Sequence, residues 1–211
     1  MAISATLGLL ALIILLTPIL CRLVGRSTGW FLGLGYLGAA AMFMPAATAA
    51  VTDGTAFPTA QETMWSLAWM PSFDVNLSFA VDGVGAIFTM IALVIGAFVL
   101  FYSTRYLSRG PNYSFYLLMA TFTFAMVGLV LTDNLFVLFV CWEITSIASF
   151  MLIARSGRAA EGASLRTMFM TFMGGVLLLV AVSAMYGVVG SASIREVLGS
   201  SVWQEKPLAT R

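Results

Sequence analysis

Long apolar segments separated by short polar ones dominate this chain. Six of them come close to the roughly 20 residues that a helix needs to cross a bilayer. They lie near residues 3–21, 30–51, 83–102, 113–132, 135–154 and 168–189. The pattern predicts an all-α membrane protein with about six transmembrane helices in residues 1–190, followed by a polar tail over residues 191–211.

The loop over residues 52–82, between the second and third segments, follows a different pattern. Its apolar residues recur at every second position on both sides of the break Met70-Pro71-Ser72, first at Trp65, Leu67 and Trp69, then at Phe73, Val75, Leu77, Phe79 and Val81. A period of two around a short proline-containing break predicts a β-hairpin. An irregular loop with chance alternation is the alternative.

The basic residues next to the spans fall on one side of the predicted membrane. Seven arginines follow the first, third and fifth spans: Arg22, Arg26, Arg105, Arg109, Arg155, Arg158 and Arg166. The loops between spans on the opposite side carry no Lys or Arg. The positive-inside rule therefore predicts that the arginines lie in the cytoplasm, and that the N-terminus and the hairpin lie outside. We expect a multi-pass protein of the cell membrane.

Composition excludes several classes of protein. The chain is 61% hydrophobic and 9% charged, whereas a soluble domain is roughly 25% charged. It has no histidine and only two cysteines, so no metal site or bound cofactor is predicted. No basic tract indicates nucleic-acid binding, and no enzyme active site is visible.

The fifth span carries the one carboxylate that lies well inside a predicted helix. Glu143 stands near the middle of DNLFVLFVCWEITSIASFMLIA, residues 133–154. A carboxylate at such a position costs roughly 2.5–3.5 kcal/mol on insertion scales, so these residues face other helices or a wet cavity and commonly handle protons or ions. We expect Glu143 to lie on such a path. The plainer alternative is a hydrogen bond that holds a neighbouring helix.

Two serines extend the polar character of this helix. Ser146 lies one turn after Glu143 on nearly the same face, and Ser149 continues the stripe. We include both in the candidate proton path, as hydroxyls that bond the carboxyl group or hold a chain of waters. The alternative is that each bonds its own backbone or a neighbouring helix.

The spans supply no basic partner for Glu143. No arginine lies well inside a span, and the only lysine is Lys206 in the tail. A proton relay through Glu143 is therefore incomplete within these 211 residues. Asp82 and Asp133, at span edges opposite the arginines, are predicted to cap helix N-termini.

Several motifs in order along the chain carry a family resemblance. They are FAVDGVGAIF (79–88), YSTRYL (102–107), FYLLM (115–119) and LTDNLFVLFVCWEITSIASFMLI (131–153). Over nearly its whole length the chain resembles the N-terminal part of the A subunit of Mrp-type multisubunit Na+/H+ antiporters. This family of antiporter-like subunits is shared with respiratory complex I and related hydrogenases. The pattern from Trp142 to Ile147 resembles the Mrp A subunit more than the complex I subunits, which are less similar after the Trp-Glu pair.

The resemblance implies a function and partners. It implies a subunit of a hetero-oligomeric membrane complex that exchanges Na+ for H+, with other antiporter subunits as partners and no cofactor. It also implies a fifth-helix glutamate on the proton-transfer path, which is Glu143 here, an outward N-terminus, and a hairpin before the third helix. Family members continue through a broken seventh helix whose lysine pairs with this glutamate. We expect that lysine to come from outside these 211 residues.

Two other functions fit the same residues. One is a proton-pumping membrane subunit of a complex I-like or hydrogenase complex, in which partner subunits would carry the redox chemistry. The other is a non-conducting scaffold subunit that packs against its partners through faces of small residues.

Overall fold

The computed structural model describes residues 2–52, 65–70, 75–107 and 112–200. Within these ranges six helices are long and apolar enough to cross a membrane. They are α1 (Ala2–Leu23), α2 (Thr28–Thr52), α3 (Gly83–Tyr106), α4 (Tyr113–Leu131), α5 (Leu135–Ala154) and α6 (Glu161–Val189). Each predicted apolar segment forms one of these helices. The predicted all-α membrane class is therefore confirmed.

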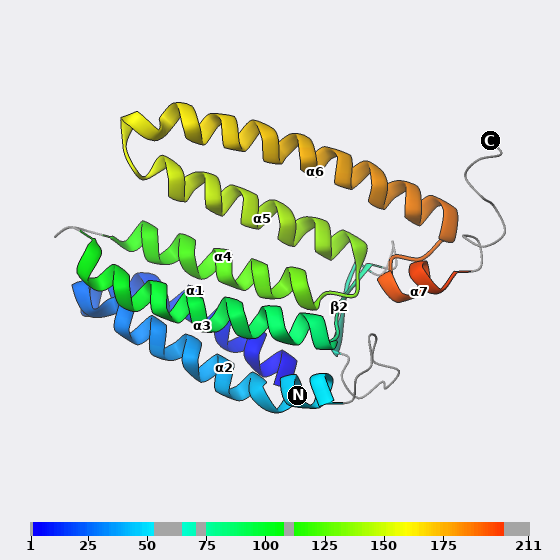
Figure 1. The fold of residues 1–211 in the computed structure, drawn as a ribbon, viewed down its shortest axis with the longest axis horizontal. Coiled ribbons are helices and arrows are strands. Elements are labelled where there is room, and N and C mark those ends of the chain that lie inside the picture. The colour runs from blue at the N-terminus through cyan, green and yellow to red at the C-terminus, as the bar shows by residue number, and fades with distance from the viewer. Residues whose placement is uncertain (1, 53–64, 71–74, 108–111, 201–211) are drawn as a thin grey trace.

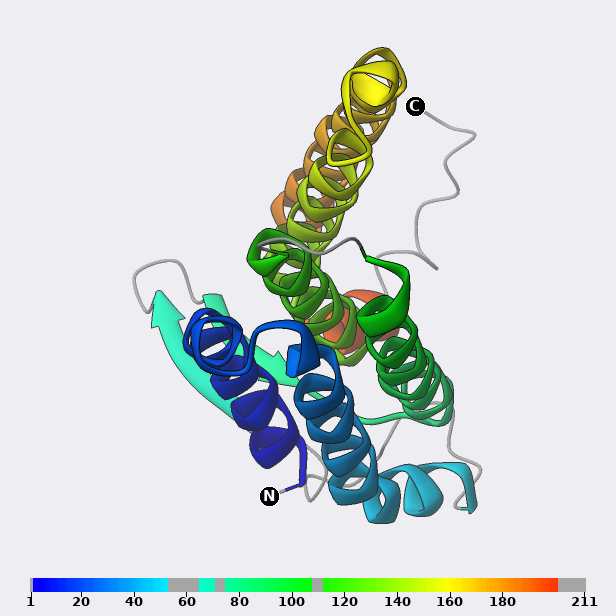
Figure 2. The same ribbon diagram turned by 90° about the vertical axis from the view of Figure 1, so that its left-hand side faces the viewer.

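The helices form a bundle in which α6 lies at one edge (Figures 1 and 2). Helices α1 to α4 pack together around fully buried side chains that include Tyr36, Phe43, Leu93 and Leu100. Helix α5 lies between α4 and α6, and α6 packs mainly on α5. The pair α5–α6 thus packs on the outside of a four-helix core. Glu143 lies at the interface between α5 and α6.

Glycine allows a close helix contact in the core. Helix α2 packs on α3 through Gly29, where a Cβ atom would lie 2.5 Å from the backbone carbonyl oxygen of Leu100. A side chain of any size would therefore force the two backbones apart. This is the way small residues act in membrane helix packing, because lipid offers no hydrophobic gain for bringing helices together.

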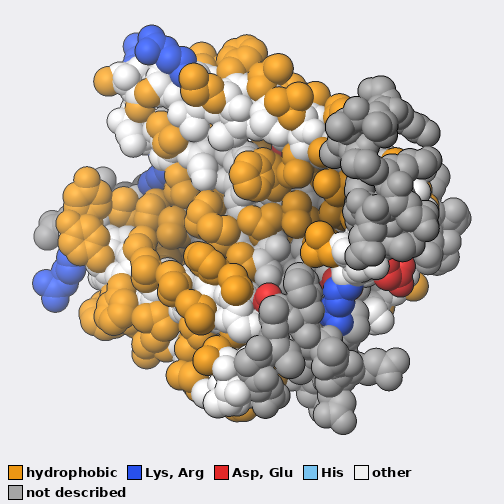
Figure 3. Space-filling model, turned by 45° about the vertical axis from the view of Figure 1, so that its right-hand side comes forward, with side chains coloured by type: hydrophobic (Ala, Val, Ile, Leu, Met, Phe, Trp, Pro, Cys, Tyr) orange, Lys and Arg blue, Asp and Glu red, His pale blue; other side chains and the backbone are white. Residues whose placement is uncertain are grey.

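Apolar side chains cover the sides of the bundle. Figure 3 shows them as a broad continuous surface on one face, with charged side chains near its two ends. Large apolar side chains are exposed on the helices, among them Phe98, which is 63% exposed, and Met170, which is 79% exposed. Such exposure would be unfavourable in water and is expected for side chains that contact lipid.

A two-stranded antiparallel sheet precedes α3, as the alternating pattern predicts. Strand β1 (Trp65–Met70) pairs with β2 (Val75–Phe79), and Trp65 lies opposite Phe79 with stacked rings 5.9 Å apart. The sheet is held at the end of α4, where the Ala80 N–H donates to the Leu131 carbonyl oxygen over 2.7 Å. The remaining parts of the predicted loop, residues 53–64 and 71–74, lie outside the described residues.

Helix α6 begins earlier than its apolar pattern predicts. The predicted span starts near residue 168, but the helix starts at Glu161, after the 3-10 turn η4 (Arg158–Ala160). The first turns carry Glu161 and Arg166. These charged residues lower the hydropathy there, so the apolar pattern starts later, but both residues are compatible with a helix. After α6 a short helix α7 (Ile194–Gly199) begins the tail, and residues 201–211 lie outside the described residues.

Candidate functional site

Glu143 lies near the middle of α5. The helix starts after Asn134, whose side-chain oxygen accepts hydrogen bonds from the backbone N–H groups of Phe136 (2.9 Å) and Val137 (3.3 Å). The cap satisfies two of the N–H groups that a helix start leaves unpaired. The helix then runs between α4 and α6, and its packing against them fixes the position of Glu143 between these helices.

The Glu143 carboxylate lies against Gly175 of α6. A Cβ atom at Gly175 would lie 3.0 Å from the Glu143 Cδ atom and closer still to Oε1, so no other residue fits there without moving the carboxylate. Gly175 is buried, and its neighbour Gly174 is exposed with nothing near it. The missing side chain of one glycine thus makes the space that the carboxylate occupies.

No described residue donates a hydrogen bond to Glu143 Oε1, although this atom is buried. The salt bridge found in the described part of the chain joins Arg195 to Asp133, at the end of the bundle that holds the sheet. A buried oxygen without a donor costs about 1–3 kcal/mol, and more when it is charged. Among the described residues, no hydrogen bond to Oε1 offsets this cost.

No hydrogen bond from the two serines of the candidate path to this carboxylate is found among the described residues. The Ser146 hydroxyl donates to the Trp142 carbonyl oxygen of its own helix over 3.0 Å, as does that of Thr145 over 2.7 Å. Ser149 is half-buried on the same helix, and no hydrogen bond to it is found among the described residues. The backbone-bonded alternative therefore holds for Ser146, and a part for either serine in proton transfer stays a prediction.

Sequence reasoning missed the role of Gly175. The pair Gly174-Gly175 stands inside a long apolar span, which is a weak signal of close helix approach. The sequence cannot tell which of two adjacent glycines faces the neighbouring helix. That choice depends on the rotation of α6 about its axis, which its packing on α5 sets.

Arg22, Arg105 and Arg155 stand at the ends of α1, α3 and α5, and we call this end of the bundle the arginine end. It is opposite the end that holds the sheet (Figure 1). The ends of α1, α3 and α5 and the starts of α2, α4 and α6 all lie at one end (Figure 1). There Arg155 donates to the side chains of Asn112 (3.0 Å) and Ser114, which ties the end of α5 to the start of α4. Arg109 lies outside the described residues. The orientation of this end toward the cytoplasm stays a prediction.

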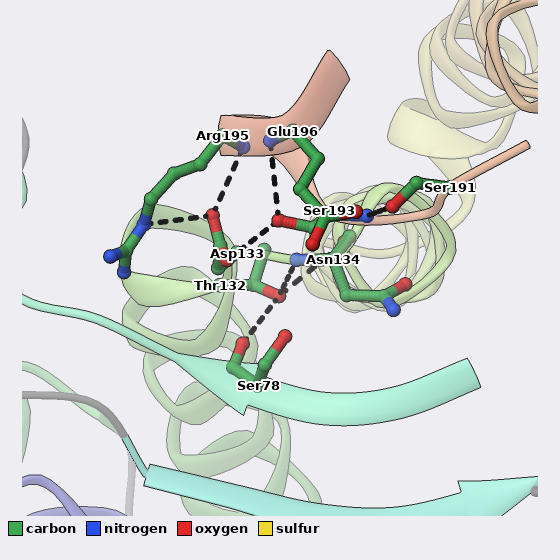
Figure 4. A network of polar contacts seen from close by, with 8 residues as sticks. All are labelled: Ser78, Thr132, Asp133, Asn134, Ser191, Ser193, Arg195 and Glu196. Carbon is green, nitrogen blue, oxygen red and sulfur yellow. Dashed lines mark hydrogen bonds and ion pairs between the residues drawn. The ribbon is translucent and has the colours of Figure 1, made fainter. Parts of the chain in front are cut away.

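The two aspartates at the sheet end have different roles. Asp82 is a helix N-cap as predicted, and its Oδ1 accepts from the Gly85 N–H over 2.7 Å. For Asp133 the predicted cap is wrong, because Asn134 caps α5 instead. Asp133 is buried, and its Oδ1 forms an ion pair with Arg195 Nε at 3.3 Å and accepts from the Arg195 backbone N–H over 3.4 Å. Its Oδ2 accepts from the Ser193 hydroxyl over 3.1 Å, as Figure 4 shows.

The Asp133 network joins three parts of the chain that are far apart in sequence. The Asp133 N–H donates to the Ser78 carbonyl oxygen of β2 over 2.9 Å, and the Ile194 N–H donates to the Asp133 carbonyl oxygen over 2.8 Å. The Leu135 N–H also donates to the Ala192 carbonyl oxygen over 2.9 Å. The turn between α4 and α5 is thus hydrogen-bonded to the sheet on one side and to the start of α7 on the other (Figure 4).

Two family models match this chain. Residues 67–117 match the model described as complex I chain 5 N-terminus, and residues 132–208 match the one described as NADH:quinone oxidoreductase/Mrp antiporter, transmembrane. Among solved structures, a chain of the Mrp complex from Dietzia sp. DQ12-45-1b has a TM-score of 0.87 and 35% sequence identity, over 98% of this chain and 22% of that chain. The chain belongs to the family of antiporter-like membrane subunits.

Relatives of this antiporter-like chain among curated proteins are named as antiporter subunits. The antiporter subunit mnhA2 of Staphylococcus aureus (strain MRSA252) is 40% identical over 141 residues, which is 64% of this chain and 18% of that protein. The mnhA2 subunit of Staphylococcus haemolyticus (strain JCSC1435) is 37% identical over 143 residues, 65% of this chain and 18% of that protein. The chain thus spans less than a quarter of the length of these relatives. The predicted resemblance to the N-terminal part of an Mrp A subunit is confirmed.

The fold extends beyond antiporters. A chain of respiratory complex I from Thermus thermophilus has a TM-score of 0.68 at 21% identity, over 92% of this chain and 38% of that chain. At this identity the likeness establishes a shared fold and nothing finer. This antiporter-like chain is a multi-pass membrane protein, similar to subunits of multisubunit membrane complexes.

Proposed function

We propose that this chain is a membrane subunit of a multisubunit Na+/H+ antiporter and that Glu143 takes up and releases a proton during exchange. One observation carries the proposal. The Glu143 carboxylate lies in the middle of a membrane helix with a buried oxygen that no described residue bonds. A buried carboxylate oxygen without a donor carries an uncompensated desolvation cost, and a bound proton would remove the charge that causes it.

The opposing base belongs outside the described residues. Within them the arginines at the ends of α1, α3 and α5 lie at one end of the bundle, and Arg195 is paired with Asp133 at the other. A proton that leaves Glu143 needs an acceptor at membrane depth. We propose that a further segment, in the same polypeptide or in a partner subunit, places a basic side chain beside α5 and α6.

Sequence similarity favours Na+/H+ exchange over redox-driven pumping. The antiporter relatives are 35–40% identical to this chain, whereas the complex I chain is 21% identical. A complex I-like role would require redox cofactors in partner subunits. Purification of the complex tests this: Na+-dependent proton movement without flavin or iron–sulfur absorption supports the antiporter, and copurifying redox cofactors support the alternative.

Replacement of Glu143 in the assembled complex tests the proposal. We expect Glu143→Gln to abolish Na+-driven proton movement in membrane vesicles, measured with a pH-sensitive dye, while Glu143→Asp retains part of it. Glu161→Gln is the matched control, because Glu161 is an exposed acid in the first turn of α6. Normal exchange by an assembled Glu143→Gln complex would contradict the proposal and favour a scaffold subunit.

A further inference from the structure

A polar pocket opens at the arginine end of the bundle, between the start of α2 and the end of α3. It has a volume of about 350 Å³ and is lined by Ser27, Trp30, Thr104 and Arg105. Ser27 ends the 3-10 turn η1 (Gly25–Ser27) and Trp30 lies in the first turn of α2, while Thr104 and Arg105 lie in the last turn of α3. The pocket is separate from Glu143, which faces α6.

Among the residues that the structure describes, Arg105 is the only charged side chain that lines this pocket. Its side chain is exposed, and none of the acids that the structure describes forms an ion pair with it. The Ser27 hydroxyl, also exposed, is a second donor beside it. A guanidinium and a hydroxyl without an opposing carboxylate favour a ligand with anionic oxygens, and phosphate matches the forked geometry of arginine.

An aromatic surface made of Trp30, Phe101 and Phe98 extends from this pocket along the bundle. The rings of Trp30 and Phe101 lie 4.9 Å apart, and the rings of Phe101 and Phe98 lie 6.5 Å apart. Phe98, Phe101 and Arg105 follow one another at helical spacing on one face of α3, so the rings extend from the charge toward the middle of the span. Trp30 is 49% exposed and Phe98 is 63% exposed.

The position of Phe101 depends on a glycine of α2. A Cβ atom at Gly33 would lie 2.7 Å from Phe101 Cδ1, so the ring lies directly on the backbone of α2. This contact fixes the middle of the aromatic surface between the two helices. A polar pocket at the membrane boundary therefore continues without a break into an apolar surface that faces lipid.

We propose that this pocket and its aromatic surface bind one anionic phospholipid. The lipid phosphate lies against Arg105 and Ser27, and one acyl chain runs along Trp30, Phe101 and Phe98. Basic pockets between membrane helices recognise lipid headgroups in this way, and tryptophan commonly lies at the headgroup level. A soluble anion would use the pocket but not the aromatic surface, and for this reason we assign the ligand to the bilayer.

Photolabelling with two probe lipids tests the proposal on the full chain, reconstituted with the subunits that copurify with it. The vesicles are made of phosphatidylcholine with a small fraction of a probe lipid that carries a photoactivatable group in its acyl chain. The probe is either phosphatidylglycerol or phosphatidylcholine. Mass spectrometry measures the labelled fraction of the peptide that contains Phe98 and Phe101. We expect the phosphatidylglycerol probe to label it about fivefold more, the ratio that one basic residue gives near a membrane surface.

Variants decide whether Arg105 causes this preference. Arg105→Gln should bring the ratio close to one, Arg105→Lys should retain most of it, and Arg158→Gln should leave it unchanged. Arg158 is the matched control, because it is an exposed arginine at the same end of the bundle outside the pocket. The proposal is wrong if the native chain shows no preference, or if Arg105→Gln keeps it. Inorganic phosphate in millimolar excess should not reduce labelling, and a loss of labelling would assign the pocket to a soluble anion instead.

Discussion

Gly175 of α6 leaves the space in which the carboxylate of Glu143, on α5, lies. The relationship is steric, since a Cβ atom at Gly175 would lie 3.0 Å from Glu143 Cδ and nearer to Oε1. It links a feature of helix packing to the proposed chemistry. The closeness of α6 decides where the carboxylate points, and therefore which donors and acceptors can reach it.

Gly175→Ala should impair exchange without preventing assembly. The added methyl group displaces the carboxylate, and a displacement of about 1 Å from a working geometry can reduce a rate by up to about 100-fold. Gly174→Ala is the matched control, because a Cβ atom there meets nothing within 4 Å. Exchange rates in vesicles, normalised to the amount of complex, provide the measurement. Equal rates for the two variants would show that the Gly175 contact does not position Glu143.

Asp133 and Arg195 should hold α7 on the bundle. We expect Asp133→Ala to raise the hydrogen-exchange rate of the backbone amides in Ile194–Gly199 by roughly 10- to 100-fold, since hydrogen bonds to charged groups contribute about 1.5–3 kcal/mol. Glu196→Gln is the control, because Glu196 is an exposed acid of the same helix. Unchanged protection of α7 in Asp133→Ala would mean that its backbone contacts alone hold it.

The cap at the start of α3 should contribute to stability by itself. Asp82→Ala removes the acceptor of the Gly85 N–H, and loss of such a cap costs about 1 kcal/mol. Asp82→Asn keeps an oxygen in place and should restore most of this loss. Thermal unfolding in detergent, followed by circular dichroism, measures both. The cap assignment would fail if the two variants were equally destabilised.

Close packing of α2 on α3 should make Gly29 intolerant of substitution. In Gly29→Ala the new methyl group meets the Leu100 carbonyl oxygen, which belongs to the backbone and cannot turn aside. We expect a loss of about 1–3 kcal/mol, typical of overpacking. Gly38→Ala on the same helix meets nothing within 4 Å and should be neutral. The comparison uses the same unfolding measurement, and a stable Gly29→Ala protein would contradict the packing.

The sequence predicts the spans and the hairpin because their signals are local. An apolar run of the length of α5 has few alternatives to a membrane helix, and alternation around Met70-Pro71-Ser72 predicts two strands. The sequence also identifies Glu143 as a candidate functional residue, because it is the one acid within a long apolar run. These features need no knowledge of neighbouring helices.

The contacts of the site are not local, and they could not be predicted in the same way. Gly175 meets Glu143 only because α6 packs on α5 with a particular rotation, and Asp133 pairs with Arg195 across 62 positions of sequence. Asp133 and Asn134 are both good capping residues, so propensity alone could not decide which one caps α5. Tertiary contacts make the choice, because Arg195 and Ser193 bind Asp133.

A change in the protonation of Glu143 during exchange is the central claim, and infrared difference spectroscopy tests it most directly. Spectra of the active complex, recorded with and without a Na+ gradient, should differ in the carbonyl band of a protonated carboxyl group. This difference band should disappear in Glu143→Gln and remain in Glu161→Gln. An active complex that shows no such band, or that keeps it in Glu143→Gln, would contradict the account.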